Sequence, residues 1–322
     1  MAKLRIYGEL ALFSGTGSLD LATKIADYVH VPLYQREIVT FSNENIFVRL
    51  KTSVRGKDVF IIQTTSSPVS HNIMELLLLL DTVKRANAGR ITAVVPYFAY
   101  GRSDKKDQPR VPISARLMAD LITTAGADRF MLVDLHAGQI QGFFDIPGDE
   151  LSAFRALSDY FVSKQLTNAV VVAVDLGFAK KGRNFAERLH LPMAFIEKRR
   201  DADKATVNAL TVIGDVAGRN VLLVDDEVNT GCSVKEAVDI LKLQGAADIY
   251  LSFTHAAFSL DAYERLGTLP VKEIVFTDTI PVPPDKLLPN MTVLSLSSFI
   301  GEVIRRVHEG ESVGAMYRDS DP

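Results

Sequence analysis

The sequence has little of what marks disulfide-linked, nucleic-acid-binding or membrane-spanning proteins. Its 322 residues include one cysteine, Cys232, which excludes an internal disulfide and agrees with a reducing compartment. The net charge is −3, so there is no basic excess to attract nucleic acid. The longest apolar run, residues 73–86, is broken by Glu75 and Asp81 and predicts a buried helix, not a membrane span. The N-terminal residues lack the apolar core of a signal peptide. We therefore expect a cytoplasmic protein with neither nucleic-acid nor membrane partners.

What is present is a globular composition, with 47% hydrophobic and 23% charged residues. Short apolar runs alternate with segments of helical period. The expected strands are residues 3–8, 58–63, 91–97, 129–135, 168–174, 192–197, 220–226, 248–255 and 273–278, and the expected helices include 70–88, 112–125, 178–190 and 232–244. The central strands are apolar on both faces, which indicates a parallel sheet covered by helices. The alternation predicts an α/β fold.

The strand–helix pattern occurs twice along the chain. Each half has an apolar strand that ends in an acid, "MLVDLHA" at 131–137 and "VVAVDLGF" at 171–178. The stretch "FDIPGDELSAF" at 144–154 separates the two halves. We expect two domains, residues 1–148 and 149–322, with the C-terminal helix packing back on the first domain.

The stretch "VLLVDDEVNTGCSV" at 221–234 carries the clearest chemical signal. Asp225 and Asp226 end an apolar strand, at the sheet edge where ligands bind in α/β folds. Small and hydroxyl-bearing residues follow, and then a helix, which favours a nest of backbone N–H groups for a phosphate. Carboxylates beside such a nest suit the hydroxyls of a sugar phosphate. The predicted site comprises Asp225, Asp226, Asn229, Thr230, Gly231, Cys232 and Ser233.

The simpler interpretation of this stretch is that the acids cap the following helix. We favour the binding loop because the run of glycine and hydroxyl residues has no capping purpose of its own. The Gly-Lys-Ser/Thr signature is missing, so the loop is not a Walker A motif.

The stretch resembles the phosphoribosyl pyrophosphate (PRPP) signature of type I phosphoribosyltransferase folds, and most of the chain resembles PRPP synthetase, the ribose-phosphate pyrophosphokinase family. The resemblance covers residues 53–86, 96–122, 126–151, 254–259 and 275–281, and "DLHAGQIQGFFDIP" at 134–147 is especially specific. It implies two tandem phosphoribosyltransferase-like domains, each a mainly parallel sheet flanked by helices. It also implies transfer of the diphosphoryl group of ATP to the 1-hydroxyl of ribose 5-phosphate, giving PRPP and AMP for nucleotide biosynthesis.

The resemblance also implies roles for individual residues. Lys198 and Arg200, in "IEKRR", would act on the moving phosphates, and His136 and Asp175 would bind Mg²⁺. Family members assemble through their N-terminal halves into dimers and often hexamers, which implies a homo-oligomer. The residues expected to bind ATP are Phe41, Asn43, Glu44, Asn45, Arg102 and Ser103.

Several positions depart from the family pattern, which keeps other functions open. Asn43, Glu44 and Asn45 stand where the family has Asp-Gly-Glu, Ser103 replaces a glutamine, and Phe178 replaces a glycine. These changes motivate a second hypothesis, a regulatory paralogue that assembles with an active synthetase but has lost turnover. A third is a phosphoribosyltransferase, which would use PRPP as a substrate. The duplicated architecture argues against the third.

Overall fold

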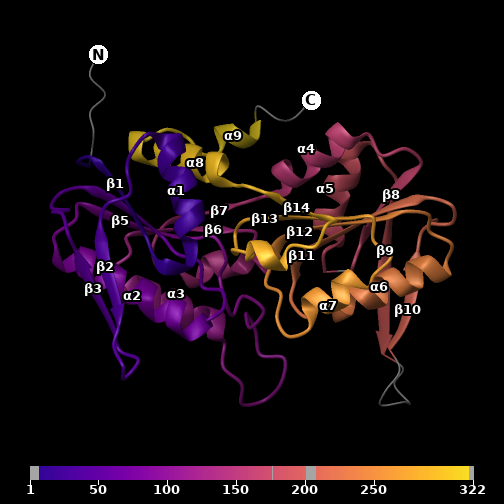
Figure 1. Cartoon of the computed structure of the whole chain (residues 1–322), viewed down its shortest axis with the longest axis horizontal. Coiled ribbons are helices and arrows are strands. Elements are labelled where there is room, and N and C mark those ends of the chain that lie inside the picture. The colour runs from indigo at the N-terminus through magenta and orange to yellow at the C-terminus, as the bar shows by residue number, and fades with distance from the viewer. Residues whose placement is uncertain (1–6, 176, 201–207, 319–322) are drawn as a thin grey trace. The chain divides into compact units, whose positions relative to one another are not determined.

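The computed structural model describes residues 7–175, 177–200 and 208–318 (Figure 1). By its internal contacts the chain divides into two units. Unit 1 contains the described residues up to Leu151, together with Thr279–Pro281 and the described residues from Ser295 onward. Unit 2 contains Ser152–Asp278 and Val282–Leu294. Both units are α/β, so the predicted fold class is confirmed.

Unit 1 is built on a five-stranded parallel sheet with the order β1-β4-β5-β6-β7. Every residue of β4 is buried, as expected for a strand with helices on both faces. The strands are β1 (Leu10–Ser14), β4 (Asp58–Ile62), β5 (Arg90–Val95), β6 (Arg129–Val133) and β7 (Gly148–Leu151).

Helices cover both faces of this sheet: α2 and α3 lie on one side, and α1 and α8 lie on the other (Figure 1). Helices α1 and α8 approach closely at Gly301, where an added Cβ would lie 2.6 Å from a ring carbon of Tyr28. Any larger residue at that position would force the Tyr28 ring to move. The helical segments of unit 1 are η1 (Thr16–Ser18), α1 (Leu19–Val29), α2 (Val69–Arg85), α3 (Ser114–Ala125), η2 (Gly138–Phe143), α8 (Ser297–Glu309) and α9 (Ala315–Arg318).

A separate antiparallel hairpin in unit 1 was not predicted from the sequence. It pairs β2 (Arg36–Thr40) with β3 (Ile46–Leu50), and β3 packs against α2. Most of its residues are only partly buried, so neither strand shows the apolar run that revealed the central strands.

Unit 2 is built on a seven-stranded sheet with the order β10-β9-β8-β11-β12-β13-β14. All neighbours are parallel except β10, which runs antiparallel to β9. The strands are β8 (Ala169–Ala173), β9 (Met193–Arg200), β10 (Asn208–Ile213), β11 (Asn220–Val228), β12 (Ile249–Ala256), β13 (Glu273–Thr277) and β14 (Met291–Leu294).

Figure 1 shows α4 and α5 on one side of this sheet and α6 and α7 on the other. All eight residues of β12 are buried, which matches its position inside the sheet. The helical segments are α4 (Phe154–Lys164), α5 (Ala179–Leu189), α6 (Cys232–Leu243), α7 (Ala262–Gly267) and η3 (Pro284–Lys286).

Eight of the nine expected strands overlap an observed strand, and the exception is the first. Of the expected strand 3–8, residues 3–6 lie outside the described residues, and Tyr7 and Gly8 belong to no strand. Among the described residues, the first strand is Leu10–Ser14, which is paired with β4. The expected helix over the apolar run 73–86 is confirmed as α2, with Leu76, Leu79 and Leu80 buried.

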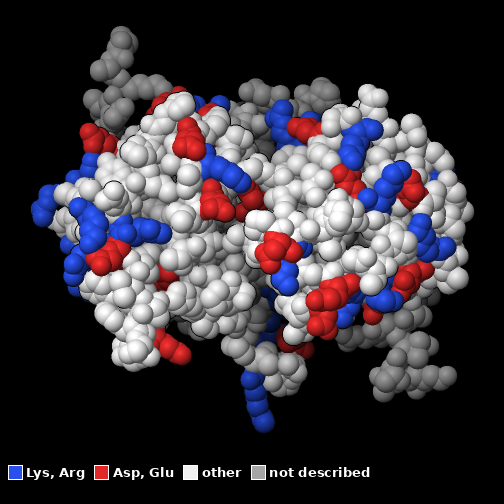
Figure 2. Space-filling view, viewed as in Figure 1, with Lys and Arg blue, Asp and Glu red and all other residues white. Residues whose placement is uncertain are grey.

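Surface charge is mixed in sign. On the face that Figure 2 shows, Lys and Arg side chains of the described residues lie among Asp and Glu side chains. In the part of the chain that the structure describes, no helix is long and apolar enough to cross a membrane.

Candidate active site

The predicted sugar-phosphate loop joins β11 to α6 in three residues. Gly231 has a φ of 72°, in the left-handed region that glycine adopts without steric cost, and α6 begins at the next residue. The carbonyl of Gly231 accepts the first helical hydrogen bond, from Lys235 N at 2.9 Å. The backbone N–H of Cys232 points toward Thr230 Oγ1, at 3.4 Å. The chain therefore turns directly from the sheet edge into a helix N-terminus.

This turn leaves backbone donors available. Within the described residues, no acceptor lies at hydrogen-bonding distance from the N–H groups of Thr230 and Gly231. They precede the first turn of α6, whose own N–H groups have no partner within the helix. Consecutive donors of this kind beside a helix N-terminus form an anion-binding arrangement. Two such donors lie where the sequence predicts a phosphate nest, which stays a prediction.

Negative charge is concentrated beside the loop. Burial raises the pKa of Asp225 well above its usual range, and the neighbouring charges of Asp226 and Asp175 raise it further. The backbone N–H of Asp226 donates to Asp225 Oδ1 at 2.9 Å, which opposes this rise. Asp226 and Glu227 are themselves buried. Asp175 follows a different strand, β8, and is thus close enough to Asp225 to interact with it electrostatically.

Phe178, which stands where the family has a glycine, does not disrupt the position of Asp175. Its backbone N–H donates to Asp175 Oδ1 at 2.9 Å. Phe178 directly precedes α5, and its side chain is buried. The bulky residue turns into the protein and leaves this backbone contact to the carboxylate in place.

Lys198 and Arg200 lie within β9, not after it. The sequence predicts a strand that ends at residue 197, but the observed strand continues to Arg200. The extension is explained by β10, which pairs Leu210 with Lys198 and Asn208 with Arg200. The side chains of Lys198 and Arg200 lie outside the described part of the structure.

The predicted ATP segment in unit 1 forms the turn of the β2–β3 hairpin. Phe41 N donates to Asn45 O at 2.8 Å, and Glu44 N donates to Phe41 O at 2.9 Å. Asn43 Oδ1 accepts from Asn45 N at 3.2 Å. Phe41 is 52% exposed, and its ring centroid lies 6.2 Å from that of Phe47. The amide of Asn43 therefore helps close the turn, and Phe41 presents an aromatic surface to solvent.

Glu44 has a φ of 65°, the left-handed region, which is costly for a residue with a side chain. This is the position at which the family pattern carries glycine. The structure thus retains the turn that a glycine would favour, although a glutamate now occupies it.

Two other predicted positions lie close together in unit 1. Arg102 is exposed, and Ser103 N donates to Tyr100 O at 2.8 Å in a turn after β5. His136 follows β6 and is also exposed. A Cβ built on Gly101 would lie 3.8 Å from Cβ of His136, so the residue before Arg102 packs beside His136. Arg102 and His136 come from loops that follow the neighbouring parallel strands β5 and β6.

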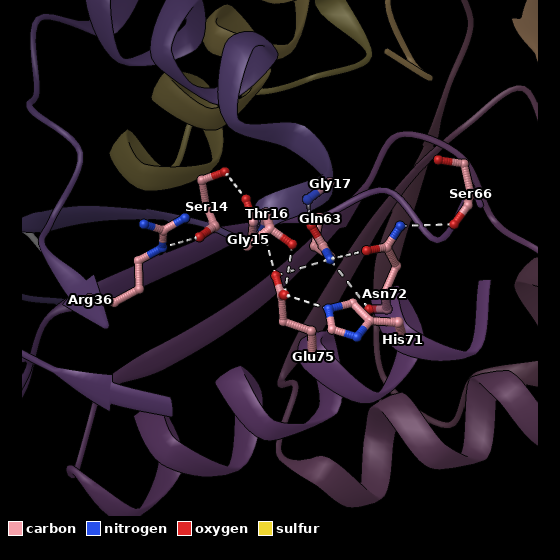
Figure 3. Close-up of polar contacts among 10 residues, drawn as sticks. All are labelled: Ser14, Gly15, Thr16, Gly17, Arg36, Gln63, Ser66, His71, Asn72 and Glu75. Carbon is pink, nitrogen blue, oxygen red and sulfur yellow. Dashed lines mark hydrogen bonds and ion pairs between the residues drawn. The ribbon is translucent and has the colours of Figure 1, made fainter. Parts of the chain in front are cut away.

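A buried polar network in unit 1 was missed by the sequence analysis (Figure 3). Glu75, fully buried on α2, accepts hydrogen bonds from the backbone N–H and hydroxyl of Thr16, the latter at 2.7 Å. Gln63 Nε2 also donates to it, at 3.2 Å. A Cβ on Gly15 would lie 2.7 Å from Glu75 Oε1, so only glycine fits there. The network fixes the loop after β1. The only signal in the sequence was an acid inside an apolar run.

Comparisons with known proteins identify the family of the chain. The N-terminal domain of ribose phosphate pyrophosphokinase matches residues 10–126, and the phosphoribosyl synthetase-associated domain matches residues 201–318. The ribose-phosphate pyrophosphokinase of Caldanaerobacter subterraneus subsp. tengcongensis is 45% identical over 315 residues, which cover 97% of this chain and 99% of the relative. The chain belongs to the ribose-phosphate pyrophosphokinase family.

Another member of the ribose-phosphate pyrophosphokinase family, from Campylobacter jejuni subsp. jejuni, is 44% identical over 307 residues, covering 95% of this chain and 98% of the relative. Among solved structures, phosphoribosylpyrophosphate synthetase from Mycobacterium smegmatis matches with a TM-score of 0.90 and 40% identity. That match covers 94% of this chain and all of the other. The fold of the family is therefore retained over nearly the whole chain.

The ribose-phosphate pyrophosphokinase resemblance implies a magnesium ion, and the chemistry of these residues shows whether they suit it as ligands. Burial is the largest cause of the raised pKa of Asp225, and the charges of Asp226 and Asp175 add to it, so a divalent cation at these carboxylates would favour their ionised form. Carboxylate oxygens are also the ligands that Mg²⁺ prefers, whereas the imidazole of His136 is a less typical one. In the described ranges, no group of three or more His, Cys, Asp or Glu side chains is arranged to hold a metal alone. The residues fit an ion that draws its remaining ligands from water and substrate phosphates, as Mg²⁺ commonly does.

Proposed function

We propose that the protein transfers the diphosphoryl group of ATP to the 1-hydroxyl of ribose 5-phosphate. The ribose oxygen bonds to the β-phosphorus, the bond from that phosphorus to the oxygen kept by AMP breaks, and the hydroxyl proton is released. The observation that carries the proposal is the loop after β11, where two backbone N–H groups that have no acceptor among the described residues lie beside a carboxylate cluster, in a chain of this family.

The sugar would be held at this loop in unit 2. The N–H groups of Thr230 and Gly231 and the start of α6, with Cys232 and Ser233, would bind the 5-phosphate. Asp225 and Asp226 would accept hydrogen bonds from the vicinal ribose hydroxyls. Binding at both ends of the sugar would fix the orientation of the 1-hydroxyl, and positioning is the main requirement of phosphoryl transfer.

The phosphate chain of ATP would be neutralised by cations. We assign this role to Lys198 and Arg200, whose positive charges would stabilise the transition state more than bound substrate. We assign nucleotide binding to the exposed Phe41, the hairpin turn with Asn43, Glu44 and Asn45, and the loop with Arg102 and Ser103. Asp175 and His136 would each serve as a Mg²⁺ ligand within their own unit, and Mg²⁺ supplies further charge neutralisation on the phosphates when bound.

The test is an assay of AMP and PRPP formation from ATP and ribose 5-phosphate with magnesium present. The expected result is turnover that depends on all three additions. If the protein bound both substrates but gave no product under saturating conditions, the proposed activity would be refuted, and the regulatory-paralogue hypothesis would replace it.

Two substitutions separate the proposed roles. Asp225→Ala should weaken ribose 5-phosphate binding, whereas Lys198→Ala should leave that binding nearly unchanged and lower turnover by about 10²-fold or more. Asp215→Ala is a matched control, because Asp215 is an exposed acid of the same unit paired with Arg219. Equal loss of sugar affinity in the first two variants would contradict the assignment.

We also propose that the chain is a cytoplasmic homo-oligomer based on dimers, as the family resemblance implies. Light scattering coupled to gel filtration measures this directly. A mass of one chain at micromolar concentration would contradict it.

A further inference from the structure

Three successive backbone carbonyls, at the end of β11 and in the sugar-phosphate loop, are held by one segment of unit 2, residues 258–265. Phe258 N donates to the carbonyl of Val228 at 3.2 Å, and Ser259 N donates to that of Asn229 at 3.1 Å. The guanidinium of Arg265 donates to the carbonyl of Thr230. We call the three donor residues, Phe258, Ser259 and Arg265, the carbonyl clamp.

The carbonyl clamp determines where the loop N–H groups point. In a trans peptide, the carbonyl of one residue and the N–H of the next are directed oppositely. The bonds that follow Asn229 and Thr230 are trans. Because the carbonyls of Asn229 and Thr230 face the clamp, the N–H groups of Thr230 and Gly231 face away from it. These are the two donors that lack acceptors among the described residues.

Side chains add to the contact between the carbonyl clamp and the sugar-phosphate loop. The hydroxyl of Ser259 donates to Asn229 Oδ1. Arg265 also packs beside the left-handed turn, since its Cδ would lie 3.8 Å from a Cβ added to Gly231. Hydrogen bonds thus hold Asn229 and Thr230, and a packing contact reaches Gly231, the third residue of the loop.

The clamp is anchored in the core. The ring of Phe258 lies 5.9 Å from that of Phe253 on β12 and 5.5 Å from that of Phe276 on β13, both fully buried. Arg265 belongs to α7, where its backbone N–H donates to Asp261 O at 2.9 Å. A rigid support of this kind is what a preorganised binding loop requires.

We infer that Arg265 and Ser259 are positioning residues for ribose 5-phosphate: they hold the loop peptides in the orientation that directs the N–H groups toward its phosphate. The inference rests on the proposed function of the loop. Neither residue needs to touch the sugar. Arg265 acts through the Thr230 carbonyl, which would otherwise be free to rotate and turn the Gly231 N–H away.

The loss of Arg265 should therefore act mainly on sugar binding. We expect Arg265→Gln to raise the KM and Kd for ribose 5-phosphate about tenfold to a hundredfold, because a charge-assisted hydrogen bond on the binding loop is lost. The KM for ATP should change little. Arg265→Lys should recover part of the affinity, since an ammonium group can still donate to one carbonyl. Ser259→Ala removes one contact and should have a smaller effect in the same direction.

The experiment is calorimetric titration of ribose 5-phosphate into each variant, with steady-state kinetics in both substrates and a melting curve. Lys272→Gln is the control, because Lys272 pairs with Asp248 at the surface of the same unit. An unchanged Kd in Arg265→Gln, with a wild-type protein that binds the sugar, would overturn the inference. So would a uniform loss of kcat and both affinities with no rescue by lysine. If the wild-type protein itself failed to bind ribose 5-phosphate, the proposed function would fail first.

Discussion

Nδ1 of His308 lies 2.8 Å from Oδ2 of Asp58, and this contact joins the last long helix, α8, to strand β4 across 250 positions of the chain. Asp58 is fully buried and also accepts two hydrogen bonds from Arg90, at 2.8 and 2.6 Å. Arg90 in turn donates to the carbonyl of Val307 at 3.1 Å. One carboxylate therefore ties α8 to two strands of the unit 1 sheet.

Removing this carboxylate should destabilise unit 1 strongly. We expect Asp58→Ala to lower the free energy of unfolding by about 3–5 kcal/mol, because it leaves Arg90 buried without its partner. Asp81→Ala is the control, since Asp81 forms an exposed pair with Arg85 and should cost at most about 1 kcal/mol. Denaturant unfolding measures both. Comparable losses in the two variants would mean that the buried network contributes nothing specific.

The same network predicts a response to acid. Burial is the largest influence on the pKa of Asp58 and raises it, but the hydrogen bonds from His308 and Arg90 outweigh burial and lower the pKa below its usual value. A carboxyl with a lowered folded-state pKa stabilises the protein above its unfolded pKa of about 4 and loses that contribution as the pH falls further. The stability difference between the wild-type protein and Asp58→Asn should therefore shrink below about pH 4.

Glu75 should matter for the loop that follows β1. Glu75→Ala leaves the N–H and hydroxyl of Thr16 and the amide of Gln63 without this acceptor, and should cost about 2–4 kcal/mol. The backbone amides of Thr16 and Gly17 should also exchange hydrogen faster. Glu37→Ala, which removes an exposed partner of Lys51, is the matched control. Slow exchange at Thr16 in the Glu75 variant would refute the role assigned to this network.

Most of unit 2 could be predicted from the sequence because its strands are apolar on both faces and its helices are amphipathic. The run "VLLVDD" at 221–226 was recognisable for that reason, and β11 is buried along nearly its whole length. The β2–β3 hairpin was missed because it lies at the surface and shows neither a continuous apolar run nor strict alternation. The end of β9 was placed too early because antiparallel pairing with β10 carries a charged segment into the sheet.

The candidate site was predictable where the chemistry lies within one short stretch, as it does between Asp225 and Ser233. The carbonyl clamp could not be found in this way. Arg265 is 35 positions from Thr230 in the sequence. An arginine in a helix with exposed residues gives no sign that its side chain donates to a distant backbone carbonyl. Glu75 and Thr16, 59 positions apart, present the same difficulty. Long-range polar contacts depend on the sheet order, which local patterns do not fix.

The strained turn at Glu44 gives a further prediction. With φ at 65°, Glu44→Gly and Glu44→Asn should stabilise unit 1 by up to about 1 kcal/mol, because glycine and asparagine tolerate the left-handed region. Glu44→Val should destabilise it, since a β-branched side chain is least compatible with this φ. Melting curves of the three variants test the order. A valine variant as stable as the glycine variant would show that the turn does not adopt this conformation in solution.

The carboxylate cluster predicts an opposite response to pH from that of Asp58. Burial, followed by the charges of Asp226 and Asp175, raises the pKa of Asp225, so ionising Asp225 destabilises the protein without ligand. The sign is that of an acid with a raised folded-state pKa: stability is lost as the pH rises from about 4 through that pKa. Asp225→Asn should therefore melt at the same temperature as the wild-type protein near pH 4 and a few degrees higher at pH 8, at about 2–4 °C per kcal/mol.

The Asp225→Asn measurement has a control in Asp215→Asn, because Asp215 is exposed and paired with Arg219, and its substitution should give no pH-dependent gain. Magnesium should narrow the difference between Asp225→Asn and the wild-type protein at pH 8, since a cation that binds the cluster stabilises the form that retains all the carboxylates. A gain in stability that is equal at pH 4 and pH 8 would show that charge at Asp225 is not its cause. The site would then lack the repulsion between its carboxylates that a bound cation and the hydroxyls of a bound sugar would relieve.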